Sequence, residues 1–274
     1  MDIFLVQMAI ARGKPALNRA KVQSLTTELH PDKPALIVLP ELFSTGFLDA
    51  SALNMSQAAF WADSAKDDVT FLANLARESG CWVAGATVEK GPVGQDGNGG
   101  FRNLSLLFSP DGKEQGRYQK IHPFSYGGED RLFTRGNEIV AYAIEAEDSW
   151  KVQPTICYDL RFPELYRAES VRGAHLILVQ ANWPEARQLH WESLLRARAI
   201  ENQAYVAGVN CTGDQDALHF AGGSLLVSPK GEILAQGGEE EGLVHASADL
   251  KFCLQWRKQF PALSDRMPLG FYRS

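Results

Sequence analysis

One cysteine lies where its thiol could act as a nucleophile. An apolar, β-branched run over 152–156 leads into Cys157, and Pro163 marks a helix start six residues later. Proline suits a first helical turn because its missing N–H would have no partner there. Cys157 is therefore predicted where a strand turns toward a helix, and free N–H groups and the helix dipole favour a thiolate there. The alternative is a buried cysteine that packs as a small hydrophobic residue.

Two further residues that could do chemistry also follow predicted strands. Glu41 comes after the apolar run 36–39 and Pro40, so it is either a surface charge or a desolvated base. Lys120 follows an alternating strand and precedes an extended His-Pro turn. A single lysine is most often a solvated charge. A glutamate, a lysine and a cysteine in this order, each just past a strand, are more specific together than any one of them alone.

The elements that must position these residues alternate between strands and helices. Strands are predicted over 3–9, 35–39, 82–88, 103–108, 152–156, 175–179, 205–209, 224–227 and 242–248. Helices are predicted over 16–30, 56–79, 163–172 and 188–203. Such alternation indicates an α/β protein whose sheet is largely covered by helices. The glycine-rich segment 91–100 lies between two predicted strands, so we expect a long hairpin excursion there and not a domain linker.

A weak internal repeat suggests two similar halves. The segment 106–112 (LLFSPDG) recurs at 225–231 (LLVSPKG), and Val-Ala-Gly at 83–85 recurs at 206–208. The two offsets are nearly equal, which predicts two facing sheets with helices outside, each with a strand that enters a Ser-Pro-x-Gly turn. Chance is the rival explanation, since Pro-x-Gly turns are common.

The composition excludes several classes of function. The 274 residues carry a formal charge of −6, which argues against nucleic acid or an anionic membrane surface as the main partner. No apolar stretch reaches membrane-spanning length, and the N-terminus has no signal-peptide pattern. The four cysteines show no C-x-x-C spacing, and the six histidines show no metal-binding spacing. We therefore expect a soluble, cytoplasmic protein without a metal.

The three residues and their surroundings resemble the nitrilase (carbon–nitrogen hydrolase) superfamily. The family's marks stand here as Leu-Pro-Glu at 39–41, Tyr-Gln-Lys-Ile-His at 118–122 and Cys-Tyr-Asp-Leu-Arg-Phe-Pro-Glu at 157–164, with Gln119 where a basic residue is usual. The resemblance extends from the first strand to about residue 260. It implies a four-layer α-β-β-α sandwich of two mixed sheets. It also implies a single domain over 1–274, in which the last ~15 residues form a tail or a dimer-contact segment.

The resemblance also implies a mechanism that needs no cofactor. Cys157 would attack an amide carbonyl and form a thioester, while Glu41 accepts the thiol proton, delivers it to ammonia and then activates water. Lys120 and the backbone N–H of Tyr158 would stabilise the oxyanion. Family members use a second glutamate, and Glu129 stands at the matching place, where it could orient the scissile amide. The alternative for Glu129 is an exposed loop acid.

Segments 180–184 and 190–207 resemble the omega-amidase branch of the family. That branch hydrolyses the side-chain amide of 2-oxo acids such as 2-oxoglutaramate and 2-oxosuccinamate. Trp183 and Phe43 are expected to wall the pocket, and Arg187 is a candidate for holding the substrate carboxylate. The alternatives are an amidase of deaminated glutathione, another aliphatic amidase or nitrilase, and a catalytically silent binding module. Because Glu41, Lys120 and Cys157 are all retained, the sequence argues against a catalytically silent module.

Family members associate through helices beside the active site. The resemblance therefore implies a homodimer or a larger homo-oligomer with two-fold contacts. The predicted helices 163–172 and 188–203 offer apolar side chains for such contacts: Leu165, Tyr166, Leu194 and Leu195.

Overall fold

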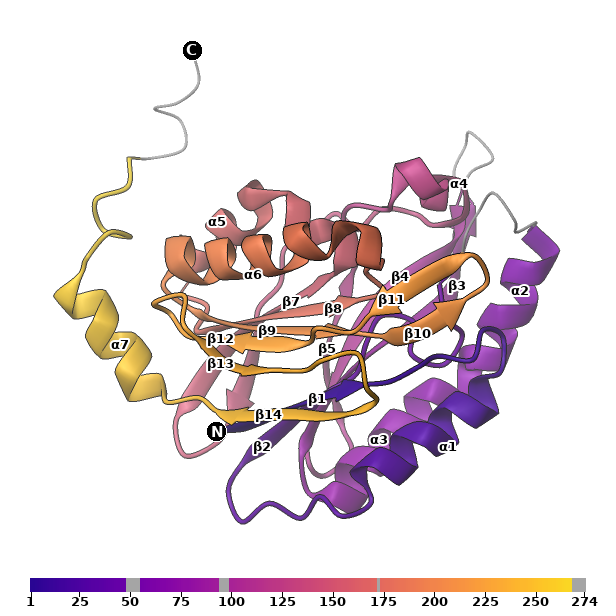
Figure 1. The fold of residues 1–274 in the computed structure, drawn as a ribbon, viewed down its shortest axis with the longest axis horizontal. Helices are drawn as coiled ribbons and strands as arrows, with labels where there is room; N and C mark the ends of the chain where they lie inside the picture. Colours follow the sequence, from indigo (N-terminus) through magenta and orange to yellow (C-terminus); the bar gives the residue numbers. More distant parts are fainter. Residues whose placement is uncertain (48–54, 94–98, 172, 268–274) are drawn as a thin grey trace.

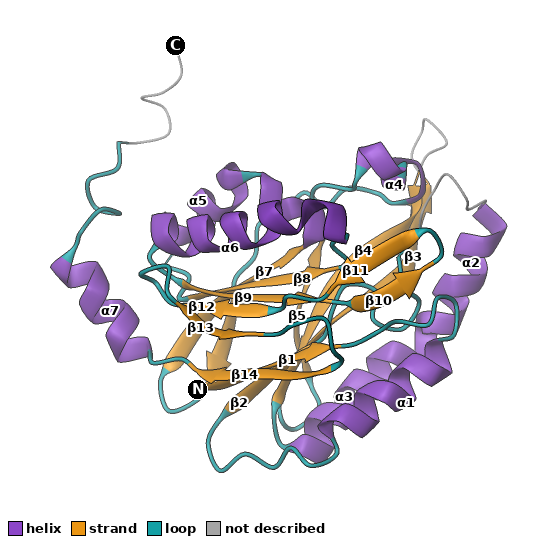
Figure 2. Ribbon diagram, viewed as in Figure 1, coloured by secondary structure: helices purple, strands orange, loops and turns teal. Residues whose placement is uncertain are grey.

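The computed structural model describes residues 1–47, 55–93, 99–171 and 173–267. They form two six-stranded mixed sheets packed face to face, with helices on the outer faces (Figures 1 and 2). The predicted α-β-β-α sandwich is confirmed. The first sheet contains β1 (Asp2–Gln7), β2 (Ala35–Val38), β3 (Trp82–Val93), β4 (Gly99–Phe108), β5 (Glu114–Gln119) and β14 (Gly242–Ser247). The second contains β6 (Tyr142–Glu145), β7 (Ser149–Ile156), β8 (Leu176–Ala181), β9 (Tyr205–Asn210), β12 (Leu225–Val227) and β13 (Ile233–Gln236).

The helices divide between the two outer faces (Figure 1). The face of the first sheet is covered by α1 (Pro15–Thr26), α2 (Met55–Ser64) and α3 (Asp68–Ser79), and the face of the second by α5 (Pro163–Val171) and α6 (Gln188–Asn202). A short helix, α4 (Glu129–Leu132), follows β5, and α7 (Leu250–Gln259) follows β14. A two-stranded hairpin of β10 (Thr212–Gln215) and β11 (Leu218–Ala221) lies beside the sheets.

The central strands are apolar on both faces because each sheet is covered on both sides. All residues of β2 and β8 are buried. One core cluster lies between the sheets and under α5 and α6, and a second lies between the first sheet and α1 and α3. Exposure of either face of a sheet to water would lose this burial. Buried apolar area stabilises the fold by roughly 25 cal/mol per Å².

The two halves of the chain repeat one topology, as the internal repeat predicted. In the first sheet β1, β2 and β3 run parallel and β4 and β5 follow antiparallel; β7, β8, β9, β12 and β13 do the same in the second. Ala84 pairs with Leu107, and the equivalent Ala207 pairs with Leu226. Each Ser-Pro-x-Gly turn closes with a glycine N–H donating to the serine carbonyl. The repeat is therefore structural and not a coincidence of turn sequences.

Several elements differ from the sequence-based expectation. The predicted helix over 56–79 is divided by a 3₁₀ turn, η1 (Ala65–Asp67). Strands β6, β10, β11 and β13 and helix α7 were not predicted, because they are short or largely exposed. The hairpin of β3 and β4 is present and pairs as far as Val93 and Gly99, while 94–98 lie outside the described residues. Residue 172, the end of a predicted helix, also lies outside them.

The residues proposed for dimer contacts are mostly part of the chain's own core. Leu165, Tyr166 and Leu195 are buried, and only Leu194 is half-buried. Tyr166 donates a hydrogen bond to Thr155 of β7, so its ring faces the second sheet. The prediction is wrong for these three residues, because the apolar stripe of each helix covers the sheet beneath it.

Among the described residues, no helix is both long and apolar enough to cross a membrane.

Candidate active site

The turn that carries Cys157 has a strained backbone. β7 ends at Ile156, and Cys157 begins a short 3₁₀ helix, η3 (Cys157–Arg161), with a φ of +45°. A positive φ is uncommon outside glycine and persists only where the surroundings impose it. Helix α5 then begins at Pro163. The predicted change from strand to helix at Cys157 is confirmed.

Asp159 ties this turn to the segment that carries Lys120. Its carboxylate accepts hydrogen bonds from Tyr118 Oη at 2.7 Å and from the backbone N–H of His122 at 3.0 Å, and His122 Nδ1 lies 2.8 Å away. It also accepts one from the backbone N–H of Ile156 at 3.0 Å. Because the carboxylate is fully buried, these contacts fix the Lys120 segment against the turn.

Two buried glutamates flank Lys120. Lys120 Nζ lies 2.7 Å from Glu41 Oε1 and 2.8 Å from Glu129 Oε2, and all three side chains are buried. Burial alone would lower the pKa of Lys120, but Glu129 and Glu41 raise it above its usual value, so the ammonium stays charged. The structure thus brings together three residues predicted from separate parts of the sequence.

The Cys157 thiol is close to Glu41 and protonated at rest. Burial raises the pKa of Cys157 well above its usual value, the charge of Glu41 and its hydrogen bond to the thiol add to this, and Lys120 opposes it. The expectation that the turn favours a thiolate is therefore wrong for the resting protein, because desolvation outweighs the N–H groups of a short 3₁₀ helix. A nucleophilic thiolate requires that a base take the proton.

Two asparagines that the sequence analysis did not select hold Glu41. The backbone N–H of Asn182 donates to Glu41 Oε2 at 3.1 Å, and its Nδ2 donates to the Glu41 carbonyl at 2.7 Å. Asn103 Nδ2 donates to Glu41 Oε1 at 2.8 Å. The Cys157 thiol lies 3.7 Å from the carbonyl oxygen of Asn182. Asn182 follows β8 as Glu41 follows β2, a positional signal that could have identified it.

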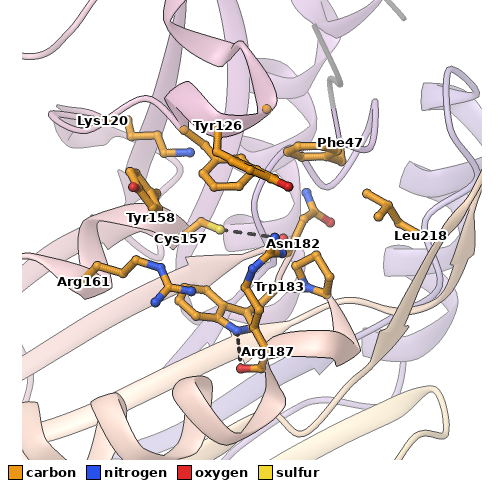
Figure 3. Close-up of a pocket in the computed structure, with 13 residues that line it drawn as sticks. Phe47, Lys120, Tyr126, Cys157, Tyr158, Arg161, Asn182, Trp183, Arg187 and Leu218 are labelled. Atoms are coloured by element: carbon orange, nitrogen blue, oxygen red, sulfur yellow. Dashed lines mark hydrogen bonds between the residues drawn. The ribbon is translucent and has the colours of Figure 1, made fainter. Parts of the chain in front are cut away.

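Cys157 and Lys120 line a cavity of about 240 Å³ (Figure 3). Of the predicted substrate-binding residues, Tyr158, Trp183 and Arg187 line it. The remaining lining residues were not predicted: Phe47, Phe124, Tyr126, Gly127, Arg161, Asn182, Pro184 and Leu218. Five of the thirteen lining residues are aromatic, and a few polar groups could orient a ligand.

Phe43 does not line this cavity, contrary to the prediction. Its side chain is fully buried in the core between the first sheet and α3, where it stacks on Phe71 at 5.9 Å between ring centroids. The chain turns sharply after β2, with Leu42 at a φ of +47°. This turn directs Phe43 toward the helix layer, and Phe47 reaches the cavity instead.

Two arginines bring positive charge to the Trp183 side of the cavity (Figure 3). The Arg161 guanidinium lies 4.6 Å from the centroid of the Trp183 ring. The Arg187 guanidinium lies 5.7 Å and 5.8 Å from the rings of Phe124 and Tyr126. Burial lowers the pKa of Arg161, and the charge of Arg187 adds to this. Two cations that repel each other in a partly buried pocket favour an anion between them.

The described residues contain no group of three or more His, Cys, Asp or Glu side chains arranged to hold a metal ion.

Comparison with known proteins identifies relatives along most of the chain. Residues 3–258 match the carbon–nitrogen hydrolase family. The chain is 34% identical over 263 residues to a 2-oxoglutaramate amidase of Bacillus subtilis (strain 168), with 96% of each protein covered. It is 36% identical over 233 residues to an omega-amidase of Escherichia coli (strain K12), covering 84% of this chain and 83% of that one. XC1258 from Xanthomonas campestris, a CN-hydrolase superfamily protein with an arsenic adduct in its active site, has a similar structure, with a TM-score of 0.84, 31% identity and 98% of both chains covered.

Proposed function

Since the chain belongs to the carbon–nitrogen hydrolase family, we propose that it hydrolyses the ω-amide of 2-oxo dicarboxylic acid monoamides, such as 2-oxoglutaramate and 2-oxosuccinamate. The products are the 2-oxo acid and ammonia. The observation that carries the proposal is one cavity with Cys157 and Lys120 in its wall and with Arg161 and Arg187 on its Trp183 side. Relatives named 2-oxoglutaramate amidase and omega-amidase support the same substrate class.

In the first half of the reaction, Cys157 Sγ attacks the amide carbonyl carbon. The Glu41 carboxylate is hydrogen-bonded to the thiol, so it accepts the thiol proton as the C–S bond forms. The same proton passes to the leaving nitrogen as the C–N bond breaks, which releases ammonia and leaves a thioester. Glu41 then takes a proton from water, whose oxygen attacks the thioester and regenerates the thiol. No proton is lost or gained by the site over the cycle.

The charge that develops on the carbonyl oxygen needs donors. Lys120 Nζ lines the cavity and remains charged, and the backbone N–H of Tyr158 follows directly after Cys157. We assign the oxyanion to these two groups. The strained φ of Cys157 supports this assignment, because it sets the direction of the following peptide unit.

Glu129 acts through Lys120 in this proposal. It is not among the residues that line the cavity, and its carboxylate binds Lys120 Nζ and the backbone N–H of Phe124, the latter at 2.6 Å. It therefore positions the ammonium group that faces the scissile amide. The sequence analysis expected Glu129 to orient the scissile amide itself; we propose instead that it acts only through Lys120.

Substrate orientation follows from the distribution of charge. The carboxylate of a 2-oxo acid amide would lie between Arg161 and Arg187, and the neutral amide would lie at Cys157. The reversed orientation would bring a carboxylate toward Glu41 and leave the two arginines without an anion. Neutral aliphatic amides and nitriles have no carboxylate for the two arginines to bind. The arrangement of charge therefore also predicts that these compounds bind weakly.

A substrate panel tests the proposal. Ammonia release is measured with 2-oxoglutaramate, 2-oxosuccinamate, propionamide, butyronitrile, deaminated glutathione and an N-carbamoyl amino acid. We expect kcat/KM for the two oxo-acid amides to exceed that for propionamide and butyronitrile by at least about 100-fold, since a desolvated charge-assisted contact contributes about 2–3 kcal/mol. Equal kcat/KM for a neutral amide, or a clear preference for deaminated glutathione, would contradict it.

Arginine variants test the carboxylate site directly. Arg161→Ala and Arg187→Ala should each raise KM for 2-oxoglutaramate about tenfold or more, with little change for propionamide, because only the acid contacts the cations. Arg196→Ala is the control, since Arg196 lies on α6, outside the lining of the cavity, where it binds the Gly231 carbonyl. An unchanged KM in both pocket variants would eliminate the proposed anchor.

We further propose that residues 1–274 act as one carbon–nitrogen hydrolase domain, as a homodimer or larger homo-oligomer in the cytoplasm. The family match over residues 3–258 supports one domain.

A further inference from the structure

Asn103 contacts every member of the Glu41–Lys120–Glu129 cluster. Its side chain extends from β4, and Nδ2 lies 2.8 Å from Glu41 Oε1 and 3.2 Å from Glu129 Oε1. Its backbone carbonyl accepts a hydrogen bond from the backbone N–H of Lys120 at 2.9 Å. The same amide group therefore joins the two acids.

The surroundings fix the orientation of this amide. Carboxylate oxygens accept hydrogen bonds, so the nitrogen must face them, whereas a flipped Asn103 would place a third oxygen against two acids. The opposite atom, Asn103 Oδ1, is buried and has no hydrogen-bond partner in the described part of the chain. A buried acceptor without a partner is unfavourable. The side chain therefore contributes through its two N–H donors.

The balance of charge explains the need for these donors. Two buried carboxylates share one ammonium group, so ion pairing compensates only one of them. Burial raises the pKa of Glu129, the charge of Glu41 adds to this, and Lys120 opposes it. Hydrogen bonds donated to an ionised carboxylate favour the ionised form. The Asn103 amide therefore acts in the same direction as Lys120, but without adding charge.

We propose that Asn103 is a positioning residue that holds Glu41 and Glu129 ionised on either side of Lys120, so that Glu41 can accept the Cys157 proton. The proposal rests on the proposed function, because it takes Glu41 as the base. Asn103 is not among the residues that line the cavity, so it acts through the two carboxylates and does not touch the substrate.

Lys120, Cys157 and Cys211 also lie near Glu41, and none of these three changes charge in the acidic range. Lys120 remains a cation. The thiols of Cys157, on η3, and Cys211, after β9, remain neutral because burial and the charge of Glu41 raise the pKa of each. We therefore expect the activity lost on acidification to follow the Glu41–Glu129 pair.

The experiment measures the alkylation of Cys157 by iodoacetamide against pH in the full chain, without any amide substrate. In the wild type, the alkylation rate should fall at low pH, where a protonated Glu41 cannot accept the thiol proton. This fall is the acidic limb of the rate–pH profile. Asn103→Leu keeps the branching of the side chain, is larger than asparagine, and removes both donors. We expect this acidic limb to move to higher pH by about one unit. The limb of kcat/KM for 2-oxoglutaramate should move equally, with KM at the pH optimum changed less than about twofold.

A second variant and a control separate this role from a loss of packing. Asn103→Asp preserves the shape and adds an acid, so it should move the limb further than Asn103→Leu. Ser105→Ala is the matched control, because Ser105 is buried two residues further along β4 and donates to Gln180 rather than to the glutamates. This control should leave the limb in place.

An acidic limb that stays in place in both folded variants would overturn the proposal. Absence of cooperative unfolding in Asn103→Leu would mean that this variant is not folded. The position of the acidic limb in Asn103→Asp then tests the proposal instead. A limb that moves in alkylation while the wild type hydrolyses none of the amides would support the role of Asn103 and contradict the proposed function. The two inferences can therefore fail separately.

Discussion

At the scale of single residues, the proposed chemistry depends on the proton that Cys157 and Glu41 share. Burial and Glu41 raise the pKa of the Cys157 thiol, so the resting site holds thiol and carboxylate. Transfer of that proton within the pair yields thiolate and carboxylic acid without exchange with solvent. Above the acidic limb, the reactive fraction is thus independent of pH until the pair loses its last proton.

This argument predicts the behaviour of Glu41→Gln. The amide keeps the shape and removes the base, so turnover should fall about 10²-fold or more. Alkylation of Cys157 should lose its level region near neutral pH and instead rise with pH, since only solvent can then take the proton. Intact-mass measurement gives the alkylation rate, and Cys157→Ala should lack the fast adduct because Cys81, Cys211 and Cys253 are not among the residues that line the cavity. Near-normal turnover of Glu41→Gln would exclude this mechanism.

Only some of the residues of this site could be predicted from the sequence. Cys157, Glu41 and Lys120 were identified because each is a reactive type directly beyond a strand. Asn103 lies within β4, where a buried polar residue carries no positional signal. Its partners are Glu41 in the turn after β2 and Glu129 at the start of α4, 62 and 26 residues away, so only the fold reveals the contact.

At the scale of elements, the internal repeat governs how helices meet the sheets. Gly85 on β3 and Gly208 on β9 occupy equivalent positions in the two halves. A Cβ on Gly85 would lie 2.5 Å from Leu72 Cδ2 of α3, and a Cβ on Gly208 would lie 2.5 Å from Leu195 Cδ1 of α6. Each glycine therefore allows a helix to approach the sheet closely.

Gly85→Ala and Gly208→Ala should destabilise the protein by similar amounts. Both leucines are fully buried, so the added methyl group forces a shift, with an expected loss of about 1–3 kcal/mol in the free energy of unfolding. Urea denaturation measures it. Gly242→Ala in β14 is the control, since nothing lies within 4 Å of its Cβ position. A loss confined to one of the two variants would contradict the equivalence of the halves.

The repeat was visible in the sequence because its turns need glycine at a fixed place, with φ of +74° at Gly112 and +84° at Gly231. The edge strand β13 was not visible, because three of its four residues are exposed and show no buried face. Helix α7 was missed although Asp249 caps it by accepting a hydrogen bond from the backbone N–H of Lys251. That capping aspartate is a signal that could have located it.

At the scale of the whole molecule, the outer faces decide how copies can meet. On α6 the apolar residues that remain exposed are Leu189 and Ile200, with exposed fractions of 76% and 53%. They are eleven residues apart, so they lie on nearly the same side of the helix, away from the sheet. A two-fold contact through this side would place the same residues of two copies against each other.

We predict a homodimer or larger assembly that Leu189→Glu combined with Ile200→Glu weakens. In a two-fold contact each substitution occurs twice, so four carboxylates would be buried or opposed, and the dissociation constant should rise at least about tenfold. Sedimentation velocity at several concentrations measures it, with circular dichroism to verify folding. Leu17→Glu is the control, because Leu17 is also 53% exposed but lies on α1, which covers the other sheet (Figure 1). A wild type that sediments as a monomer at micromolar concentration, or dissociation caused by the α1 variant alone, would contradict this interface.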